Sequence, residues 1–285
     1  MPPVPCNGGE TVKQMSEHVY MLPCAAEGDR PDLFLIAGKE RSFMVDAGAS
    51  EKHRREFMEQ VARAGLPAPE QLALTHWHWD HSFGLQGMVL PWYANPLTLG
   101  YLQLARQQSW DIQAVARRVE WGQENQIVQQ GMAVEQPGCA PPIPAVEGTP
   151  LKNGEEFELG DVTVQAICLP CDHTDDAVAY LVQQDHLLLL GDALYPDYYH
   201  GPNHYSLRRL RGLGETLQRL AFDQAISSHG EELLEKTHLV EFIARLGSGN
   251  ILPEALASPA LRQLLEVVQA DGALVLEERG VVQRL

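Results

Sequence analysis

Basic residues are scarce in this chain. Lysine and arginine together number 21, against 38 aspartates and glutamates, and the formal net charge is −17 at pH 7. Proteins that bind nucleic acid need basic side chains to contact phosphates. Docking to anionic lipid likewise depends on basic clusters. The composition therefore argues against both kinds of partner.

Long hydrophobic runs are also missing. No stretch comes near the roughly 18 uninterrupted apolar residues that a transmembrane helix requires, so we expect no membrane span. The opening residues, Met1 to Pro5, have neither the positive charge nor the apolar stretch of a secretory signal. These two absences predict a cytoplasmic protein.

Cysteine is too scarce and too irregularly placed for a disulfide framework. The five cysteines are odd in number and scattered: Cys6, Cys24, Cys139, Cys168 and Cys171. This usage favours reduced thiols, as expected in a cytoplasm. Cys168 and Cys171 have CxxC spacing, but no second pair completes a structural zinc site. We interpret that spacing as incidental.

What the chain does have is enough length and apolar content for a large core. Its 285 residues are 45% hydrophobic, which suits one large domain with or without a small appendage. Apolar runs followed by turn residues predict hairpins and strands in both halves, at 33–36, 42–45, 72–75, 177–182 and 187–190. Helical spacing predicts helices at 51–64, with Ser50 as its N-cap, and at 206–220. The faint repeat between the halves indicates two facing β-sheets with helices outside.

Residues 94–150 interrupt this repeat as an insertion. Its first part, 96–130, is rich in helix formers and predicts two helices, whereas 137–150 is proline-rich and predicts an irregular connector. Trp110 and Trp121 have two interpretations. They pack the added helices onto the body, or they belong to a segment that caps a cleft.

The tail, 233–285, is predicted to be an appendage that follows a catalytic domain at 1–232. Helices are expected at 239–245 and 259–268, followed by a hairpin, a combination that resembles a small winged-helix unit. Acidic residues outnumber basic ones in this stretch, which disfavours DNA binding. We interpret the tail as a homodimer surface or as a wall of the cleft.

The most informative pattern is a run of metal-binding side chains directly after the strand predicted at 72–75. His76 and His78 are two residues apart, so in an extended chain both imidazoles point to the same side. Asp80 and His81 follow where the chain must turn, and so they face a neighbouring point. Imidazole and carboxylate are the ligands that borderline divalent metals prefer. This cluster can therefore serve two metal ions close together.

Four side chains cannot complete two metal sites, so further ligands are needed. Three candidates share one context, in that each follows an apolar run at a probable strand end: His173, Asp192 and His229. Ligand sites in open α/β sheets collect at such strand ends. The shared context makes these residues the best additional ligands.

The order His-x-His-x-Asp-His, then His, then Asp, then His, resembles the metallo-β-lactamase superfamily, in particular its glyoxalase II-like and lactonase-like members. The resemblance runs from about residue 19 to about residue 230 and includes Gly191-Asp192 and the element at 45–48. It implies an α+β fold, the four-layer αββα sandwich. Asp172 departs from the family pattern, which usually has glycine there, so the shape of the pocket near it can differ. The resemblance implies one metal at His76, His78 and His173, a second at Asp80, His81 and His229, and Asp192 as the bridge.

Two adjacent divalent ions predict hydrolysis. They lower the pKa of a bridging water from near 16 to about 7 and polarise a carbonyl, so a metal-bridging hydroxide is expected to cleave an ester, thioester or lactone of a small-molecule substrate. Zinc is the first choice for a nitrogen-rich site, with iron and manganese left open. Asp80 and Tyr195 are the candidate catalytic residues. Asp80 would orient the hydroxide or move its proton, and Tyr195 would contact a substrate oxygen or merely wall the cleft.

Two further interpretations remain open at this level. Asp46 is either the carboxylate that orients a ligating histidine or a simple turn residue. A mononuclear-iron oxidoreductase, similar to the sulfur dioxygenases, is the alternative function, because such a site needs only part of the ligand set. The complete second set, Asp80, His81 and His229, favours two metals.

Overall fold

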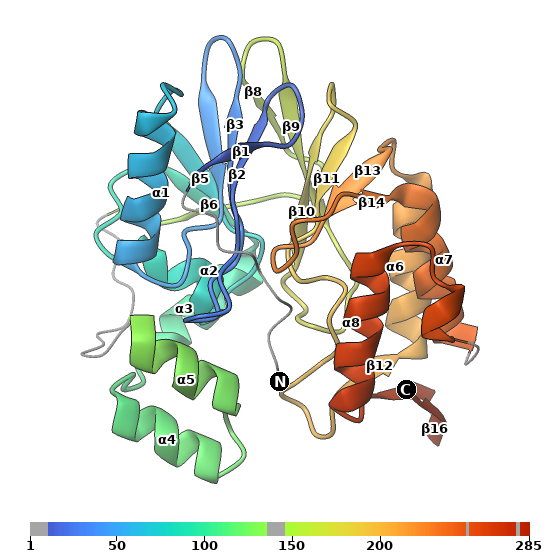
Figure 1. The fold of residues 1–285 in the computed structure, drawn as a ribbon. Coiled ribbons are helices and arrows are strands. Elements are labelled where there is room, and N and C mark those ends of the chain that lie inside the picture. The colour runs from blue at the N-terminus through green and yellow to red at the C-terminus, as the bar shows by residue number, and fades with distance from the viewer. Residues whose placement is uncertain (1–10, 136–145, 249–250, 278–279) are drawn as a thin grey trace.

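The computed structural model describes residues 11–135, 146–248, 251–277 and 280–285. Two β-sheets face each other, and helices cover their outer sides (Figure 1). The expected four-layer αββα sandwich is therefore confirmed. Cys6, Cys139 and most of the proline-rich connector lie outside the described residues.

The first sheet comes from the N-terminal half and delivers the metal-binding run. Its first four strands are antiparallel, whereas β4 to β7 are parallel neighbours. In sheet order, the seven strands are β1 (Lys13–Gln14), β2 (Val19–Leu22), β3 (Leu33–Ala37), β4 (Ser42–Val45), β5 (Gln71–Ala73), β6 (Trp92–Ala94) and β7 (Thr149–Pro150).

The second sheet comes from the C-terminal half and mixes antiparallel pairs with one parallel pair, β11 with β13. The loops that follow β9, β11 and β13 carry His173, Asp192 and His229 respectively. In sheet order, the six strands are β14 (Leu234–Glu235), β13 (Gln224–Ile226), β11 (Leu187–Leu189), β10 (Val178–Val182), β9 (Thr163–Cys168) and β8 (Glu156–Glu158).

The inner core lies between the two sheets. Strands buried on both faces read as continuous apolar runs, and β3 and β10 are of this kind. In β3, Phe34 and Ile36 point toward the other sheet, whereas Leu33 and Leu35 point toward the outer helix. Phe43 and Tyr180 meet across the gap with ring centroids 6.0 Å apart. Burial on both faces fixes the register of the strands, and hence the position of the residues that follow them.

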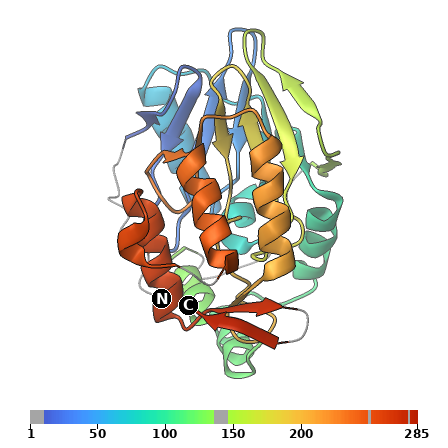
Figure 2. The ribbon, with the colours of Figure 1, turned by 90° about the vertical axis from the view of Figure 1, so that its right-hand side faces the viewer.

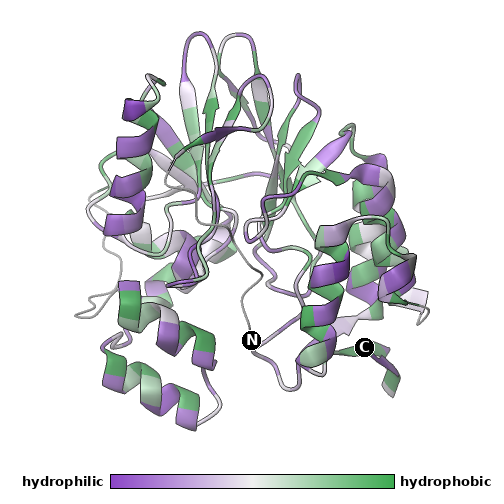
Figure 3. Cartoon of the chain, in the orientation of Figure 1, coloured by the Kyte–Doolittle hydropathy of each residue, from purple (hydrophilic) through white to green (hydrophobic). Residues whose placement is uncertain are grey.

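The outer helices are amphipathic and complete the sandwich. Helix α1 (Glu51–Arg63) begins at Ser50, whose side chain accepts a hydrogen bond from the His53 backbone N–H. It packs on the first sheet through Phe57 and Val61. Figure 3 shows hydrophilic residues on the outside of α1 and hydrophobic residues along the strands. Helices α6 (Leu207–Arg219) and α7 (Lys236–Ser248) lie side by side over the second sheet (Figure 2).

The insertion contains three helices within the described residues, so the expected number of two is wrong. The sequence pattern did not separate the first helix from the second, because only the short stretch at 106–111 divides them and it carries no proline or glycine. The helices are α3 (Pro96–Ala105), α4 (Ile112–Glu120) and α5 (Gln126–Glu135). Trp110 is buried against Phe83, with ring centroids 4.8 Å apart, whereas Trp121 is exposed.

The tail begins with β14, the edge strand of the second sheet, and continues with α7 and the short 3-10 helix η2 (Pro253–Ala255). Helix α8 (Pro259–Ala270) and the hairpin of β15 (Leu274–Glu277) and β16 (Gly280–Arg284) follow. Strand β12 (His204–Ser206) pairs in parallel with β15, so a segment of the first 232 residues joins the hairpin in a three-stranded sheet. The tail also shares one hydrophobic cluster with the second sheet. The domain boundary after residue 232, the winged-helix-like description and the homodimer stay predictions.

Candidate metal centre

The metal-binding run follows β5, which lies between β4 and β6 in the first sheet. After β5 the chain passes His76 and His78 and enters the one-turn helix α2 (Trp79–Ser82), which carries Asp80 and His81. The backbone N–H of His81 donates to the carbonyl of His78 at 3.1 Å. This tight turn separates the two histidines before it from the two donors within it, as the spacing predicts.

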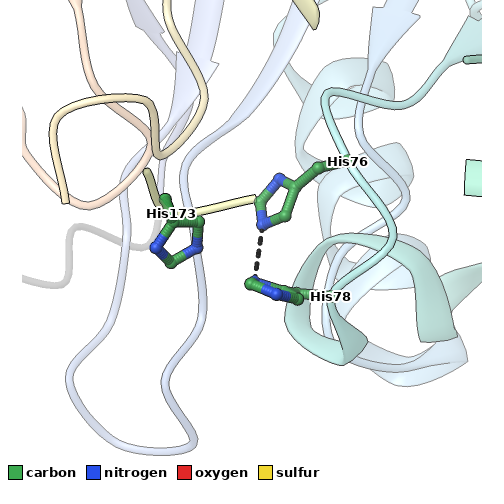
Figure 4. Close-up of side chains that lie close together, drawn as sticks. All are labelled: His76, His78 and His173. Carbon is green, nitrogen blue, oxygen red and sulfur yellow. Dashed lines mark hydrogen bonds between the residues drawn. The ribbon is translucent and has the colours of Figure 1, made fainter. Parts of the chain in front are cut away.

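The first donor set consists of His76, His78 and His173. Their nearest ring nitrogens all lie within 4.8 Å of one another. His76 Nε2 and His78 Nδ1 are 3.0 Å apart, and the rings of His78 and His173 have centroids 4.6 Å apart. Figure 4 shows His76 and His78 on one loop and His173 on another, with the three rings converging. Two segments almost a hundred residues apart therefore meet at one point.

The second donor set consists of Asp80, His81, Asp192 and His229, again with donor atoms within 4.8 Å of one another. His229 Nε2 lies 3.2 Å from Asp80 Oδ2 and 3.4 Å from Asp192 Oδ2. His81 Nε2 lies 3.2 Å from Asp80 Oδ2. All seven residues that the sequence singled out are thus brought into two adjacent sets.

Asp192 lies between the two sets. Its Oδ2 is 3.5 Å from His173 Nε2 in the first set and 3.5 Å from His81 Nε2 in the second. Strand β11 ends at Leu189, and Gly191, with φ +59°, turns the chain beside Thr75. A side chain on Gly191 would sit 2.8 Å from the Thr75 Cβ, so glycine is needed where the two halves touch.

Burial and neighbouring charges shift the pKa values of the donors in opposite directions. Burial lowers the pKa of His76 and His78 well below the usual range for histidine. Burial alone would also lower the pKa of His81, but the carboxylates of Asp80 and Asp192 raise it well above that range. The first set thus consists of neutral imidazoles. The second set surrounds its histidines with negative charge, an environment that favours a cation.

Several buried donor atoms have no hydrogen-bond partner within the described residues. They are His81 Nε2, both ring nitrogens of His173, and Asp192 Oδ1. A buried polar atom without a partner is destabilising unless a ligand satisfies it. Three imidazoles in one set, and two imidazoles with two carboxylates in the other, are donor sets that suit divalent transition metals. The residues present therefore fit two divalent ions.

Asp46 supports the second donor set. Its φ of +63° is unusual for a residue other than glycine and turns the chain at the end of β4. The Asp46 carboxylate accepts hydrogen bonds from the Thr75 backbone N–H at 2.7 Å and lies 2.8 Å from His81 Nδ1. His81 Nε2 is thereby left facing Asp80 and Asp192. Of the two sequence interpretations, the orienting carboxylate matches this geometry.

Asp176 is a functional candidate that the sequence did not reveal. This fully buried carboxylate accepts hydrogen bonds from the Trp77 backbone N–H at 2.9 Å and from Thr98 Oγ1 at 2.6 Å, and also from Thr174 Oγ1. Trp77 lies between His76 and His78, and Thr174 follows His173. Asp176 therefore ties together the two loops that carry the first set. The signal was a second aspartate three residues after a candidate ligand, but sequence alone could not place its partners.

A small cavity of about 90 Å³ opens beside the donors and is mostly apolar. Tyr195, 8% exposed, lines it, with its ring centroid 6.0 Å from that of His173 and 6.2 Å from that of His229. Ile127 and Val128 of the insertion line it too. The insertion thus forms part of the wall of this cavity, and Tyr195 lies where it can reach a ligand.

Asp29 is a further carboxylate in the wall of the same cavity. Burial raises its pKa to about 6, an effect that nearby His229 opposes and that Asp80 and Asp192 reinforce. At neutral pH this side chain is therefore largely ionised. A second, larger cavity of about 600 Å³ meets the site from the other side of Tyr199 and is lined by Trp77, Tyr101 and Arg209.

Two histidines outside the donor sets are also buried. His18 is 8% exposed and His53 is 1% exposed. His18 pairs with Asp185, and burial lowers the pKa of His53 well below the usual range. Cys24 is disulfide-bonded, so the expectation of reduced thiols is wrong for this residue. Cys168 and Cys171 are free thiols, and the predicted cytoplasmic location stays a prediction.

A comparison against known families identifies the superfamily. The model of the "Metallo-beta-lactamase superfamily" matches residues 28–234, which is more than half of the chain. The chain belongs to the metallo-β-lactamase superfamily. This confirms the resemblance drawn from the ligand motif. Within the described residues of this superfamily member, no helix is long and apolar enough to cross a membrane.

One curated relative of this metallo-β-lactamase superfamily member is the acyl-coenzyme A thioesterase MBLAC2 of Gallus gallus. The two are 24% identical over 187 residues, with coverage of 59% of this chain and 59% of the relative. The chain thus spans less than two thirds of that protein.

Solved structures of metallo-β-lactamase superfamily proteins share the fold at low identity. One is a metallo-β-lactamase family protein from Thermus thermophilus, with a TM-score of 0.56, 17% identity and coverage of 92% of this chain and 96% of that one. Another is the MIM-2 metallo-β-lactamase, with a TM-score of 0.54, 18% identity and coverage of 92% and 88%. At such identities the likeness shows the fold alone.

Proposed function

We propose that this protein is a metal-dependent hydrolase that cleaves an ester, thioester or lactone bond of a small molecule. One observation carries the proposal, namely seven donor side chains in two adjacent sets with Asp192 within 3.5 Å of both. Two divalent ions held there would lower the pKa of a bound water to about 7 and polarise a substrate carbonyl. The strongly acidic chain makes nucleic acid a poor substrate.

Asp80 is placed to hold and orient the attacking group. Its Oδ2 lies 3.2 Å from both His81 Nε2 and His229 Nε2, and these histidines hold the pKa of the carboxyl far below its usual range. An ionised carboxylate in this position accepts a hydrogen bond from the attacking group and so orients it. Asp80 therefore completes the second donor set and orients the attacking group or moves its proton.

Tyr195 is proposed to donate a hydrogen bond to an oxygen of the substrate. Burial raises the pKa of its phenol well above the usual range, with Asp192 adding to the effect, so the hydroxyl stays protonated. A protonated phenol is a donor to the oxygen on which negative charge develops as the carbonyl is attacked. The buried position of Tyr195 also helps to exclude bulk water.

Thioesters are the first substrates to test, because the curated relative carries the name of an acyl-coenzyme A thioesterase. Elemental analysis of purified protein, followed by assays with thioesters, esters, lactones and phosphodiesters, tests the proposal. We expect about two zinc, manganese or iron ions per chain and carbonyl-bond cleavage. One iron per chain with oxygen consumption and no hydrolysis would instead identify a mononuclear-iron oxidoreductase of the sulfur dioxygenase type.

Replacement of Asp80 by asparagine tests this role of Asp80. Asp80→Asn keeps the size of the side chain but removes its charge, and we expect kcat to fall by roughly 10²–10⁴-fold. Asp175→Asn is the matched control, because Asp175 is an exposed carboxylate whose side chain accepts a hydrogen bond from Tyr101 and belongs to neither donor set. Steady-state kinetics and circular dichroism of both variants provide the readout. An unchanged kcat in well-folded, metal-loaded Asp80→Asn would exclude this role.

A further inference from the structure

Asp29 is a carboxylate near the metal centre that belongs to neither donor set. It lines the small cavity beside the metal centre. Its carboxylate forms no hydrogen bond or ion pair with any residue that the structure describes. The part of the chain described here contributes no lysine or arginine to the lining. The cavity therefore has one carboxylate beyond the metal donors, with no lysine or arginine of the described residues in its wall to pair with it.

Arg30, the basic residue next to Asp29 in the chain, pairs with other carboxylates. Arg30 Nε donates to Glu135 Oε1 at 2.7 Å, and Arg30 Nη1 donates to Glu56 Oε2 at 2.5 Å. Glu135 also accepts a hydrogen bond from Ser50 Oγ. The guanidinium of Arg30 is thus held by two carboxylates and does not turn toward Asp29.

A tight turn of the backbone holds Asp29 in the cavity wall. Gly28 and Asp29 have φ values of +79° and +51°, and Ala25 and Arg30 close the turn with two backbone hydrogen bonds of 3.0 Å. Aspartate in the left-handed region is uncommon and is found at turns and functional sites. A side chain on Gly28 would sit 2.6 Å from Glu135 Oε1, so the turn also fits tightly against the end of α5.

Apart from the metal donors and Asn125, the rest of the cavity wall is mostly aromatic and apolar. Rings of Trp79, Tyr195, Tyr198 and Tyr199 line it together with the aliphatic side chains from α5. The faces of such rings attract cations, most strongly when water is excluded. Aromatic faces combined with a carboxylate are a combination that recognises organic ammonium groups.

We propose that this cavity binds an alkylammonium group of the substrate, with Asp29 supplying the negative charge and the aromatic rings the remaining contacts. Asp29 is then a specificity-determining residue that favours cationic over neutral substrates. The site rests on the proposed hydrolase function for its meaning in catalysis. Binding of the cation itself does not, because it requires only the cavity wall.

The test compares two alcohols of the same shape, choline and its neutral analogue 3,3-dimethylbutanol. Calorimetric titration of the full-length, zinc-loaded protein at pH 8 should show choline binding roughly 3- to 30-fold more tightly. Asp29→Asn should abolish or reverse that preference, and asparagine tolerates the left-handed backbone at this position. Asp175→Asn should keep the preference, because its carboxylate lies outside this cavity.

Equal binding of the two alcohols by the wild type, or a choline preference that persists in Asp29→Asn, would overturn the proposal. If Asp29→Asn does not fold, Asp29→Gly removes the charge with a residue suited to the backbone, and the same outcomes apply. Thioesters with trimethylammonium and tert-butyl ends on the acyl chain separate the two proposals. Cleavage of both thioesters at the same rate would contradict only the proposed ammonium site. A preference for choline without cleavage of any carbonyl substrate would contradict only the proposed hydrolase function.

Discussion

Asp46 and Asp176 are buried carboxylates that support different halves of the metal centre. Asp46 lies 2.8 Å from His81 Nδ1 in the second donor set, whereas Asp176 holds the backbone N–H of Trp77 between two ligands of the first set. Neither residue belongs to the donor sets. Such supporting residues commonly change metal affinity because they fix the direction of the ligand atoms.

This division of labour predicts a selective loss of metal binding. Asp46→Asn should weaken binding at the second set by roughly 10- to 100-fold, and Asp176→Asn should do the same at the first set. Competition titration with a chelating dye and cobalt absorption spectra measure the two sites separately. Each variant is the control for the other, and an equal loss at both sites in either variant contradicts the assignment.

At this scale the sequence predicted the donors well and their supports poorly. His76, His78, Asp80 and His81 are adjacent in the chain, so their spacing alone revealed a cluster. The contacts of Asp176 and the position of Asp29 in the cavity wall arise only in the folded chain. A lone aspartate in a loop is usually a turn residue, so nothing local distinguished them.

Helix α5 is the element that connects the insertion to the site. Gly131 faces the ring of Trp79, and a Cβ there would lie 2.6 Å from Trp79 Cζ2. Glu135 at the end of the helix joins Arg30 and Ser50. The helix is therefore packed against the turn that carries Asp29 and against the first residue of α2. Between the two sequence interpretations of the insertion, the lining of the cavity by Ile127 and Val128 supports a role in the site.

A larger side chain at Gly131 should displace α5. Gly131→Leu is expected to lower the free energy of unfolding by about 1–3 kcal/mol, because the packed aromatic ring leaves no room. Gly100→Ala in α3 is the matched control, because no atom lies within 4 Å of its added methyl group and alanine favours a helix by about 1 kcal/mol. Urea unfolding of both variants provides the measurement. A fully stable Gly131→Leu protein would mean that the contact is not tight.

On the scale of the whole molecule, His18 joins the two sheets at the end away from the metal centre. It precedes β2 of the first sheet, and its Nδ1 lies 2.6 Å from Asp185 Oδ1 in the turn between β10 and β11 of the second. Burial alone would lower the pKa of His18, but Asp185 and Asp161 raise it above its usual value. A group whose pKa is raised by folding stabilises the folded state while it is protonated.

The contribution of His18 should therefore depend on pH. It is fully present below about pH 6.5, the value for unfolded histidine, and it is lost as pH rises through the higher pKa of the folded protein. His18→Gln should lower the free energy of unfolding by roughly 1–3 kcal/mol at pH 5.5 and by clearly less at pH 9. Urea unfolding at the two pH values measures this. An equal loss at both would show that the charge of His18 does not matter.

The layers of the molecule were predictable because period-two and helical patterns act locally, and because the ligand motif resembled one family. The sequence pattern did not predict the third helix of the insertion or the burial of His18 and His53. These features depend on packing between segments far apart in the chain. A polar residue that packing buries has the same local sequence context as an exposed one.

The pairing of β12 with β15 links the C-terminal hairpin, through β12, to the segment that lines the cavity. The segment from Tyr195 to Tyr199 is anchored on one side by the bridge between Asp197 and His204 and by Tyr205, whose hydroxyl donates to the Leu194 carbonyl at 2.8 Å. His204 and Tyr205 in turn pair with Leu274 and Val275. Substitutions in this hairpin can thus change ligand preference while every metal-binding side chain of the chain stays the same.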